Sequence, residues 1–350
     1  MGASIRKVFP VLMSALVISA GLWYFRATPT GEQFASGEVI CAEPALVSAD
    51  RSEPVGMVRI ERGSFTMGGV GHHRDEGPPH EVTVGGFWID RYEVTNAQFA
   101  QFVTDTGYVT VAERVPDPLR HPELPVEFLV PGSVVFVPPT DLQSGGSLTK
   151  WWQFVADADW RHPYGPGSTI MGLDNHPVVH IAYEDAVAYA QWLGRSLPTE
   201  AQWEYAARGG LEGATYAWGE KLKPNDTWQA NTWQGLFPIR NTNEDGYVGA
   251  APVGCFAANG YGLHDMSGNV WEWTKNWYQP RHRDEESEDP VGPMRSFDPR
   301  QPNASVRVIK GGSYLCAPNY CLRYRPAARH AQEPDLPAGH IGFRTVLNKS

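Results

Sequence analysis

Glycine and proline interrupt this chain so often that long helices and wide sheets have little room to form. The 350 residues include 36 glycines and 29 prolines, about a fifth of the sequence. Both residue types break regular elements and favour turns. Apolar residues make up 42% of the chain and 13 residues are tryptophan, which is ample material for a core. The composition therefore predicts a globular domain with many loops and little regular secondary structure.

Short apolar runs between these turns predict a few strands and three helices. Two of the helices start with a capping box, at Thr95 and at Thr199, because each Thr is followed three residues later by Gln. Gly107 and Gly209 are placed to end them. The third helix is expected over 184–192, and strands over 57–60, 64–67, 80–90, 306–309 and 341–346. This mixture predicts an irregular α+β fold.

The N-terminus carries the pattern of an export signal. Arg6 and Lys7 precede an apolar run over residues 8–25, and Arg26 follows. Such a run is typical of a secretory signal peptide or an uncleaved signal anchor. Because the cations come first, the remaining chain is expected on the extracytoplasmic side, whether periplasmic, secreted or luminal. The predicted organisation is a signal peptide or anchor over 1–30, a linker over 31–55 and a folded domain over 56–347.

The charged residues disfavour nucleic acid as a partner and favour internal ion pairs. The net charge is −10 with His neutral, without the basic stripe that a nucleic-acid partner requires. The arginines that follow residue 321, Arg323, Arg325 and Arg329, are expected to anchor nearby carboxylates. His72 and His73 lie in a loop rich in Asp, Glu, Gly and Pro, so we expect them in a solvated loop rather than in a metal site.

The four cysteines fall into two pairs of different character. Cys41 and Cys255 could pair with each other, although an exported chain with four cysteines does not depend on a disulfide framework. Cys316 and Cys321 have a C-x4-C spacing, which allows a local disulfide if the chain turns near Pro318. Two thiolates are also half of a zinc site, but no companion motif completes it. They also suit Cu(I), which prefers soft ligands.

Two further segments are candidates for binding. Residues 108–180 are irregular and rich in tryptophan, including Trp151, Trp152 and Trp160, and we interpret them as the wall of a groove. Residues 231–272 are rich in Asn, Asp and Glu set in loops, which suits Ca²⁺ with its six to eight oxygen ligands. The spacing is not that of an EF-hand, and turn-forming side chains are the simpler interpretation.

Several strings in the chain together resemble the sulfatase-modifying-factor domain over about residues 56–347. The similar strings are at 57–60, 65–68, 92–96, 197–205, 268–273 and 342–344. The stretch 311–325, which contains both cysteines of the C-x4-C motif, resembles the active-site signature of the formylglycine-generating enzymes within that family. The resemblance implies a C-type-lectin-like fold.

The same resemblance implies an oxidase that converts a cysteine in an unfolded or newly made sulfatase to Cα-formylglycine. In such enzymes, thiolates at the positions of Cys316 and Cys321 hold Cu(I), O2 is the oxidant and a thiol reductant is consumed. The substrate is an extended peptide carrying Cys-x-Pro-x-Arg. Ser313 and Trp271 match positions that line the oxygen and substrate pocket, and Tyr320 matches an active-site tyrosine. For Trp271, a role as core filler stays open.

The family's two calcium sites also have counterparts here, each with two side chains and two backbone carbonyls. The first set is Asn231, Thr232, Asp245 and Tyr247, and the second is Asp265, Gly268, Val270 and Glu272. His340 stands where some members have an active-site Asn, so no role is assigned to it. The alternative function is a non-catalytic ligand- or protein-binding module on the same C-type-lectin-like fold, in which the cysteine pair would be dispensable.

Overall fold

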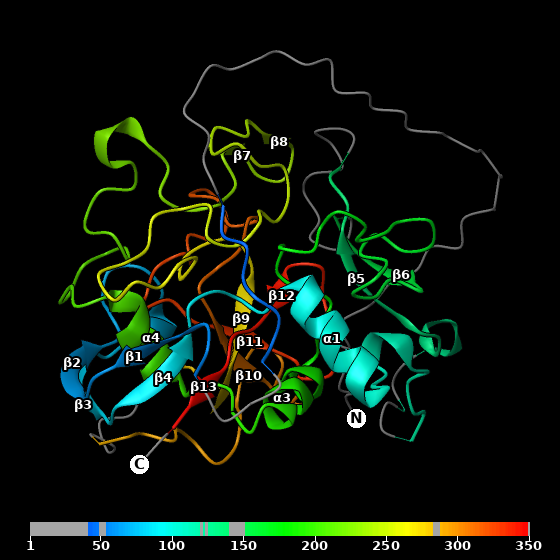
Figure 1. The fold of residues 1–350 in the computed structure, drawn as a ribbon, viewed down its shortest axis with the longest axis horizontal. Coiled ribbons are helices and arrows are strands. Elements are labelled where there is room, and N and C mark those ends of the chain that lie inside the picture. The colour runs from blue at the N-terminus through cyan, green and yellow to red at the C-terminus, as the bar shows by residue number, and fades with distance from the viewer. Residues whose placement is uncertain are drawn as a thin grey trace, which may run out of the picture. The chain divides into compact units, whose positions relative to one another are not determined.

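A four-stranded sheet brings together strands from the last quarter of the chain (Figure 1). Its order is β11-β10-β9-β12. The strands are β9 (Trp271–Trp277), β10 (Arg307–Lys310), β11 (His330–Gln332) and β12 (Ile341–Gly342). Neighbours run antiparallel except β12, which pairs parallel with β9. Strand β9 is buried along most of its length, and its buried polar side chains are hydrogen-bonded, as Thr274 is to the Val308 carbonyl at 2.8 Å.

This computed structural model describes residues 41–48, 54–119, 122, 125–139, 151–282 and 288–348. The predicted signal or anchor at 1–30 lies outside the described residues. Within them, no helix is both long enough and apolar enough to cross a membrane.

A second sheet and a hairpin are built mainly from the start of the domain, with one strand from its end. The sheet has the order β1-β4-β13, and β2 pairs with β3. The strands are β1 (Met57–Ile60), β2 (Gly63–Met67), β3 (His80–Val84), β4 (Phe87–Asp90) and β13 (Val346–Leu347). The prediction of short strands over 57–90 is confirmed, including the interruption at residues 85–86.

The predicted strand over 341–346 is wrong as a single element. It divides into β12 and β13, which belong to different sheets. Between them, Thr345 donates its N–H and its hydroxyl to Asp90 Oδ2, at 2.7 and 2.6 Å. Arg344 faces Glu272 of β9 instead, with Nε 2.7 Å from Oε2. These side-chain contacts lie where the chain passes from one sheet to the other.

Three α-helices lie in the described part of the chain, and all three were predicted. They are α1 (Asn96–Thr106), α3 (Tyr183–Trp192) and α4 (Glu200–Arg208). Both expected capping boxes form, at Thr95 with Gln98 and at Thr199 with Gln202. Gly107 and Gly209 end α1 and α4 with φ of 68° and 57°, a left-handed conformation that glycine adopts without steric cost.

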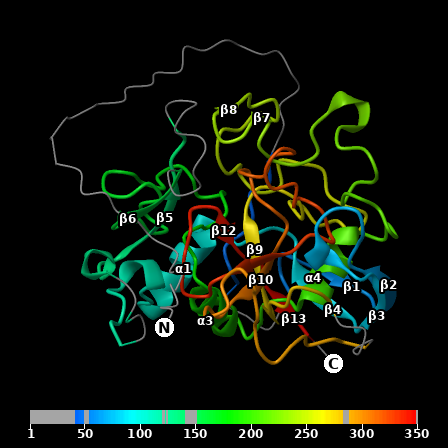
Figure 2. The same ribbon diagram turned by 180° about the vertical axis from the view of Figure 1, so that it is seen from behind.

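Short elements complete the described fold. One hairpin joins β5 (Gly132–Phe136) to β6 (Trp152–Ala156), and a smaller one joins β7 (Gly235–Leu236) to β8 (Arg240–Asn241). Both views place the β5–β6 hairpin and the β2–β3 hairpin on opposite sides of the central sheet (Figures 1 and 2). The 3-10 turns are η1 (Arg74–Glu76), η2 (Val111–Glu113), η3 (Val126–Phe128) and η5 (Pro224–Asp226). The α+β class with little regular structure is confirmed.

Part of the predicted linker, residues 41–48, is bound to the domain. Cys41 and Cys255, whose pairing the sequence left open, form a disulfide across 214 residues of sequence. The N–H of Val47 donates to Gln101 Oε1 of α1 at 2.9 Å, and Gln101 Nε2 donates back to the Val47 carbonyl at 3.1 Å. This segment therefore lies along α1.

Candidate active site at the C-x4-C loop

The loop after β10 holds Cys316 and Cys321 with their sulfur atoms bonded to each other and their Cα atoms 4.8 Å apart. Cys316 is buried in the core, whereas Cys321 is partly exposed. Because Cys321 is the more exposed of the two, a molecule arriving from solvent would meet Cys321 first.

Backbone hydrogen bonds fix Cys316 from both sides. Its N–H donates to the Ser313 carbonyl at 2.8 Å, and its carbonyl accepts from the N–H of Trp233 at 3.1 Å. Gly312 makes the approach possible, because it has φ of 75° and a Cβ there would lie 2.9 Å from the Tyr324 nitrogen. The turn before Cys316 is therefore set by close backbone packing.

The other predicted site residues lie around this loop in different environments. Ser313 is fully buried, and its hydroxyl accepts from the N–H of Leu315 at 3.3 Å. Trp271, at the start of β9, belongs to the same core cluster as Cys316 and stacks on His330 with ring centroids 5.5 Å apart. Trp271 is therefore part of the core and also a neighbour of the cysteine loop. Tyr320 differs because 42% of it is exposed.

Aromatic rings form a wall beside Tyr320. Its ring stacks on Phe237, with centroids 4.1 Å apart and planes 12° apart. Trp151 meets both rings edge-on, at 5.9 Å from Phe237 and 6.3 Å from Tyr320. The interpretation of the tryptophan-rich segment as a wall fits Trp151, but Trp160 is 2% exposed and packs in the core. Phe237 was not anticipated, since no sequence signal marks it.

His340 contributes a second aromatic contact near this wall. Its ring packs against Trp152 with centroids 4.6 Å apart, and its carbonyl accepts from the N–H of Trp271 at 2.9 Å. Burial and the nearby His330 and His180 lower the pKa of His340 to about 3. The side chain is therefore neutral at physiological pH.

The arginines after Cys321 bind buried carboxylates, as expected. Arg323 pairs with Asp75 at 3.2 Å, and Arg325 pairs with Glu76, with Nη1 2.7 Å from Oε2. Burial would raise the pKa of Asp75, but Arg323 and the Tyr278 hydroxyl lower it below its ordinary value. The carboxylate therefore stays ionised against the guanidinium.

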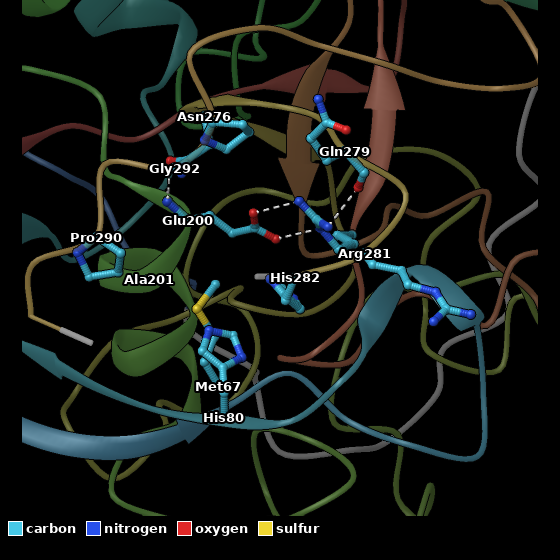
Figure 3. Close-up of a pocket in the computed structure, with 12 residues that line it drawn as sticks. Met67, His80, Glu200, Ala201, Asn276, Gln279, Arg281, His282, Pro290 and Gly292 are labelled. Atoms are coloured by element: carbon cyan, nitrogen blue, oxygen red, sulfur yellow. Dashed lines mark hydrogen bonds and ion pairs between the residues drawn. The ribbon is translucent and has the colours of Figure 1, made fainter. Parts of the chain in front are cut away.

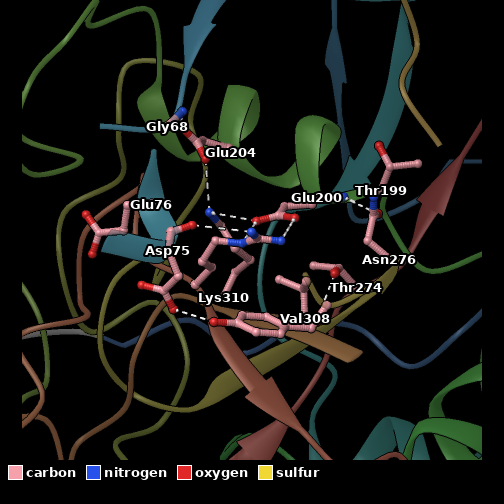
Figure 4. A network of polar contacts seen from close by, with 12 residues as sticks. Gly68, Asp75, Glu76, Thr199, Glu200, Glu204, Thr274, Asn276, Val308 and Lys310 are labelled. Atoms are coloured by element: carbon pink, nitrogen blue, oxygen red, sulfur yellow. Dashed lines mark hydrogen bonds and ion pairs between the residues drawn. The ribbon is translucent and has the colours of Figure 1, made fainter. Parts of the chain in front are cut away.

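Further ion pairs of this network involve Glu200 and Glu204 of α4 (Figure 4). Arg329 pairs with Glu200 at 2.7 Å, and Lys310 of β10 pairs with Glu204 at 3.0 Å. Burial would raise the pKa of Glu204, but Lys310 and Arg208 lower it overall. The network therefore joins the end of β10 and the segment after the cysteine loop to a helix of the scaffold.

Two oxygen atoms of the first predicted calcium site, from Thr232 and Asp245, face the same amide nitrogen. The amide nitrogen of Gln234 donates both to the Thr232 carbonyl and to Asp245 Oδ2, the latter at 2.6 Å. Asp245 Oδ1 accepts from the N–H of Tyr247 at 3.0 Å. Burial raises the pKa of Asp245. Asn231, the third predicted ligand, is buried, and its amide nitrogen donates to the Gly249 carbonyl and to Asn269 Oδ1, at 2.9 and 3.1 Å.

The second predicted calcium site combines buried acids with one strong cation. Asp265 accepts from the N–H of Gly254 at 2.6 Å, and burial raises its pKa to about 6. Glu272 is bound by Arg344 and by the indole of Trp203, at 2.8 Å each. The carbonyls of this set, from Gly268 and Val270, belong to the turn before β9.

Glu93, which was not predicted as a site residue, lies close to the acids of the second predicted calcium site. It is buried, and burial, Asp265 and Glu272 raise its pKa well above the ordinary value. Its carboxylate accepts from Asn269 Nδ2 at 3.0 Å. Among the described residues, no group of three or more His, Cys, Asp or Glu side chains gathers closely enough to hold a metal ion. Both predicted calcium sites would therefore depend on their backbone carbonyls.

A separate cavity of about 90 Å³ lies next to α4 (Figure 3). Met67, His80 and His282 line it, with the two imidazole centroids 5.2 Å apart. None of its lining residues was predicted as a site residue. Because neither cysteine of the C-x4-C loop lines it, this cavity is not the candidate active site.

The fold and the paired cysteines on this loop agree with the family that the sequence resembles. Residues 43–349 match the sulfatase-modifying factor enzyme 1-like domain, and the chain belongs to that family. It is 52% identical to the formylglycine-generating enzyme of Mycobacterium tuberculosis, in an alignment that covers 83% of this chain and 97% of that protein.

Two further similar proteins show how much the family relationship implies about activity and fold. The chain is 39% identical to a mouse protein named inactive C-alpha-formylglycine-generating enzyme 2, over 86% of this chain and 88% of the relative. Family membership alone therefore does not establish catalysis. The solved structure of PvdO from Pseudomonas aeruginosa has a TM-score of 0.57 at 23% identity, and the match covers 87% of this chain and 98% of that one. It supports the fold alone.

Proposed function

We propose that this protein activates sulfatases by converting a cysteine of a Cys-x-Pro-x-Arg motif in the unfolded or newly made polypeptide to Cα-formylglycine. The observation that carries this proposal is the pair Cys316 and Cys321, whose sulfurs lie in contact at the edge of the core. The similarity to a curated formylglycine-generating enzyme over nearly the whole domain supports it.

The donor set of the loop fits Cu(I). When the disulfide is reduced, Cys316 and Cys321 present two soft thiolates on one short loop, and thiolates favour soft metals such as Cu(I). The partly exposed position of Cys321 leaves room for a third sulfur to approach. Bound Cu(I) would supply the one-electron chemistry with O2, and a thiol reductant would keep the cysteines reduced.

The remaining residues would position the substrate and the loop. The exposed ring of Tyr320, supported by its stack on Phe237, offers a flat apolar face to an extended peptide. Trp271 and the Ser313 hydroxyl close the buried side of the loop and exclude water there. The arginine of the substrate motif would be matched by aromatic rings and by the negative net charge of the chain.

We also propose that the loops over 231–272 bind calcium. The convergence of Thr232 and Asp245 on one amide nitrogen supports the first site more directly than any contact supports the second. In the second, a cation would relieve the mutual repulsion of Asp265 and Glu93. Calcium would in both cases hold segments that contain little regular secondary structure.

We further propose an extracytoplasmic location. The disulfide between Cys41 and Cys255 is typical of proteins from oxidising compartments. The apolar run over residues 8–25 supports export by sequence alone.

The test is a reaction of Cu(I)-loaded protein, O2 and a thiol reductant with a Cys-Thr-Pro-Ser-Arg peptide. We expect an aldehyde product by mass spectrometry from the wild-type protein and none from Cys316→Ser or Cys321→Ser. Equal turnover by Cys321→Ser would overturn the two-thiolate mechanism. A wild-type protein that forms no aldehyde but binds the peptide would favour the non-catalytic module.

A further inference from the structure

The two cysteines of the loop are held through their backbone groups in different ways. For Cys316, both the N–H and the carbonyl bond to other backbone groups. Cys321 donates its N–H to the Ala317 carbonyl at 3.1 Å, also a backbone contact. Its carbonyl lies 3.1 Å from Nε2 of His73. Of these four hydrogen bonds, the one to His73 is therefore the one that a side-chain substitution can remove.

The contact fixes the protonation pattern of the imidazole. A carbonyl oxygen only accepts hydrogen bonds, so Nε2 of His73 carries the proton and donates to Cys321. The two residues are 248 positions apart in the sequence, so they belong to different loops. A side chain from a distant loop thus holds the second cysteine of the pair.

The peptide that follows Cys321 needs such restraints. Leu322 has φ of 47°, a left-handed conformation that is unfavourable for a residue with a Cβ. Its N–H donates to the Ala317 carbonyl at 3.1 Å, and its carbonyl accepts from Arg325 Nε at 2.9 Å. The His73 contact restrains the same peptide unit from the Cys321 side.

The loop that carries His73 is itself firmly placed. It connects β2 to β3 and contains Asp75 and Glu76, the buried partners of Arg323 and Arg325. The segment after Cys321 is therefore clamped to this loop at three points. Two of them are ion pairs with the arginines, and the third is the His73 contact with the cysteine itself.

We propose that His73 is a positioning residue for Cys321, which fixes the second sulfur opposite that of Cys316 through its hydrogen bond to the Cys321 carbonyl. Its relevance to catalysis rests on the proposed function, whereas its effect on the cysteine pair does not. Without this hydrogen bond, the peptide between Cys321 and Leu322 samples other orientations. In the dithiol, the two sulfurs then come within bonding distance less often, so the disulfide closes less readily.

The experiment measures how readily the Cys316–Cys321 disulfide closes. Full-length wild-type protein and the variants His73→Ala, His73→Gln and His72→Ala are equilibrated in glutathione buffers of graded ratio. Differential alkylation and peptide mass spectrometry then count each disulfide separately. The Cys41–Cys255 disulfide in the same sample reports whether the rest of the fold is intact.

We expect His73→Ala to lower the equilibrium constant for closing the disulfide by about three- to tenfold, as the loss of one hydrogen bond would. This corresponds to a reduction potential about 14 to 30 mV higher. His73→Gln places an amide N–H close to where Nε2 donates, so it recovers part of the loss. His72→Ala removes the neighbouring imidazole, which makes no contact with Cys321 in the described structure, and keeps the wild-type value.

Three results would overturn the proposal: an unchanged constant in His73→Ala, an equal shift in His72→Ala, or no recovery in His73→Gln. If the function is correct, His73→Ala also lowers kcat for the peptide without raising KM. If the wild-type protein forms no aldehyde while His73→Ala still shifts the disulfide equilibrium, the proposed function fails and the positioning role stands.

Discussion

Arg325 and Glu76 form a buried ion pair across 249 residues of sequence, and Arg325 belongs to the segment that follows the cysteine loop. Both nitrogens at the end of the guanidinium face the two carboxylate oxygens. Glu76 is 0% exposed and Arg325 is 2% exposed. The pair therefore links the segment after Cys321 to the β2–β3 connection without access to solvent.

Removing one charge of this pair should destabilise the fold strongly. We expect Glu76→Gln to lower the free energy of unfolding by about 3 kcal/mol, because the Arg325 guanidinium stays buried without its counter-charge. Urea unfolding measures the change. The matched control is Glu288→Gln, which breaks the exposed pair with Arg62 (side chains 64% and 59% exposed) and should cost less than about 1 kcal/mol. Equal losses in the two variants would contradict the assignment of the buried pair.

The disulfide between Cys41 and Cys255 should stabilise the domain without affecting the cysteine loop. It closes a loop of 214 residues, so the double variant Cys41→Ser/Cys255→Ser should lose about 2–4 kcal/mol of unfolding free energy. Thermal unfolding with and without reductant measures this. The Cys316–Cys321 disulfide should still form in the variant, and a loss of that disulfide would show that the two bonds depend on each other.

Signals that act over a few residues made much of this fold predictable. The capping boxes at Thr95 and Thr199 gave the starts of α1 and α4 because their hydrogen bonds are local. The C-x4-C spacing allowed a contact between Cys316 and Cys321 for the same reason. The expectation that the nearby arginines bind carboxylates was correct because a buried guanidinium requires a counter-charge.

Contacts between distant segments could not be predicted in this way. The sequence did not indicate that Glu76 would face Arg325, or that His73 would reach the Cys321 carbonyl. His73 was expected in a solvated loop, but it is partly buried against the cysteine segment. Phe237 has no local signal for its stack on Tyr320, because tertiary packing alone brings them together.

Buried histidines should make the fold sensitive to acid. Burial lowers the pKa of His180 to about 4, while its ring contacts the Ser133 hydroxyl at 2.7 Å and the Pro163 carbonyl at 2.9 Å. The unfolded chain takes up this proton near pH 6.5, before the native state does. The stabilisation is therefore complete above pH 6.5 and is lost as the pH falls toward 4, by about 3 kcal/mol in total.

His180→Asn tests this pH dependence. Asn tolerates the left-handed φ of 61° at this position, so the backbone is not strained further. Between pH 6.5 and 4, the slope of unfolding free energy against pH should fall by about 1.4 kcal/mol per pH unit relative to wild type. Urea unfolding at pH 7, 6 and 5 gives the slope. Identical slopes in the two proteins would show that His180 does not resist protonation.

Calcium should stabilise the loops over 231–272. If Asp245 is a ligand, removal of calcium with a chelator lowers the melting temperature of the wild-type protein, and Asp245→Asn removes the part of that effect that comes from the first site. Asp226→Asn, whose side chain is 92% exposed, serves as the control and should respond to the chelator as the wild type does. A wild-type melting temperature independent of chelator would contradict the calcium proposal.

Tyr320 should contribute to substrate binding through its ring rather than its hydroxyl. The ring is 42% exposed and is held flat against Phe237, so it can stack on an extended peptide. Tyr320→Ala should raise KM for the Cys-Thr-Pro-Ser-Arg peptide by about two- to tenfold, which corresponds to one aromatic contact, with kcat little changed. Tyr320→Phe keeps the stack and should keep the wild-type KM. A similar rise in KM for Tyr320→Phe would instead assign the contact to the hydroxyl, and a fall in kcat with unchanged KM would place Tyr320 in the chemical step.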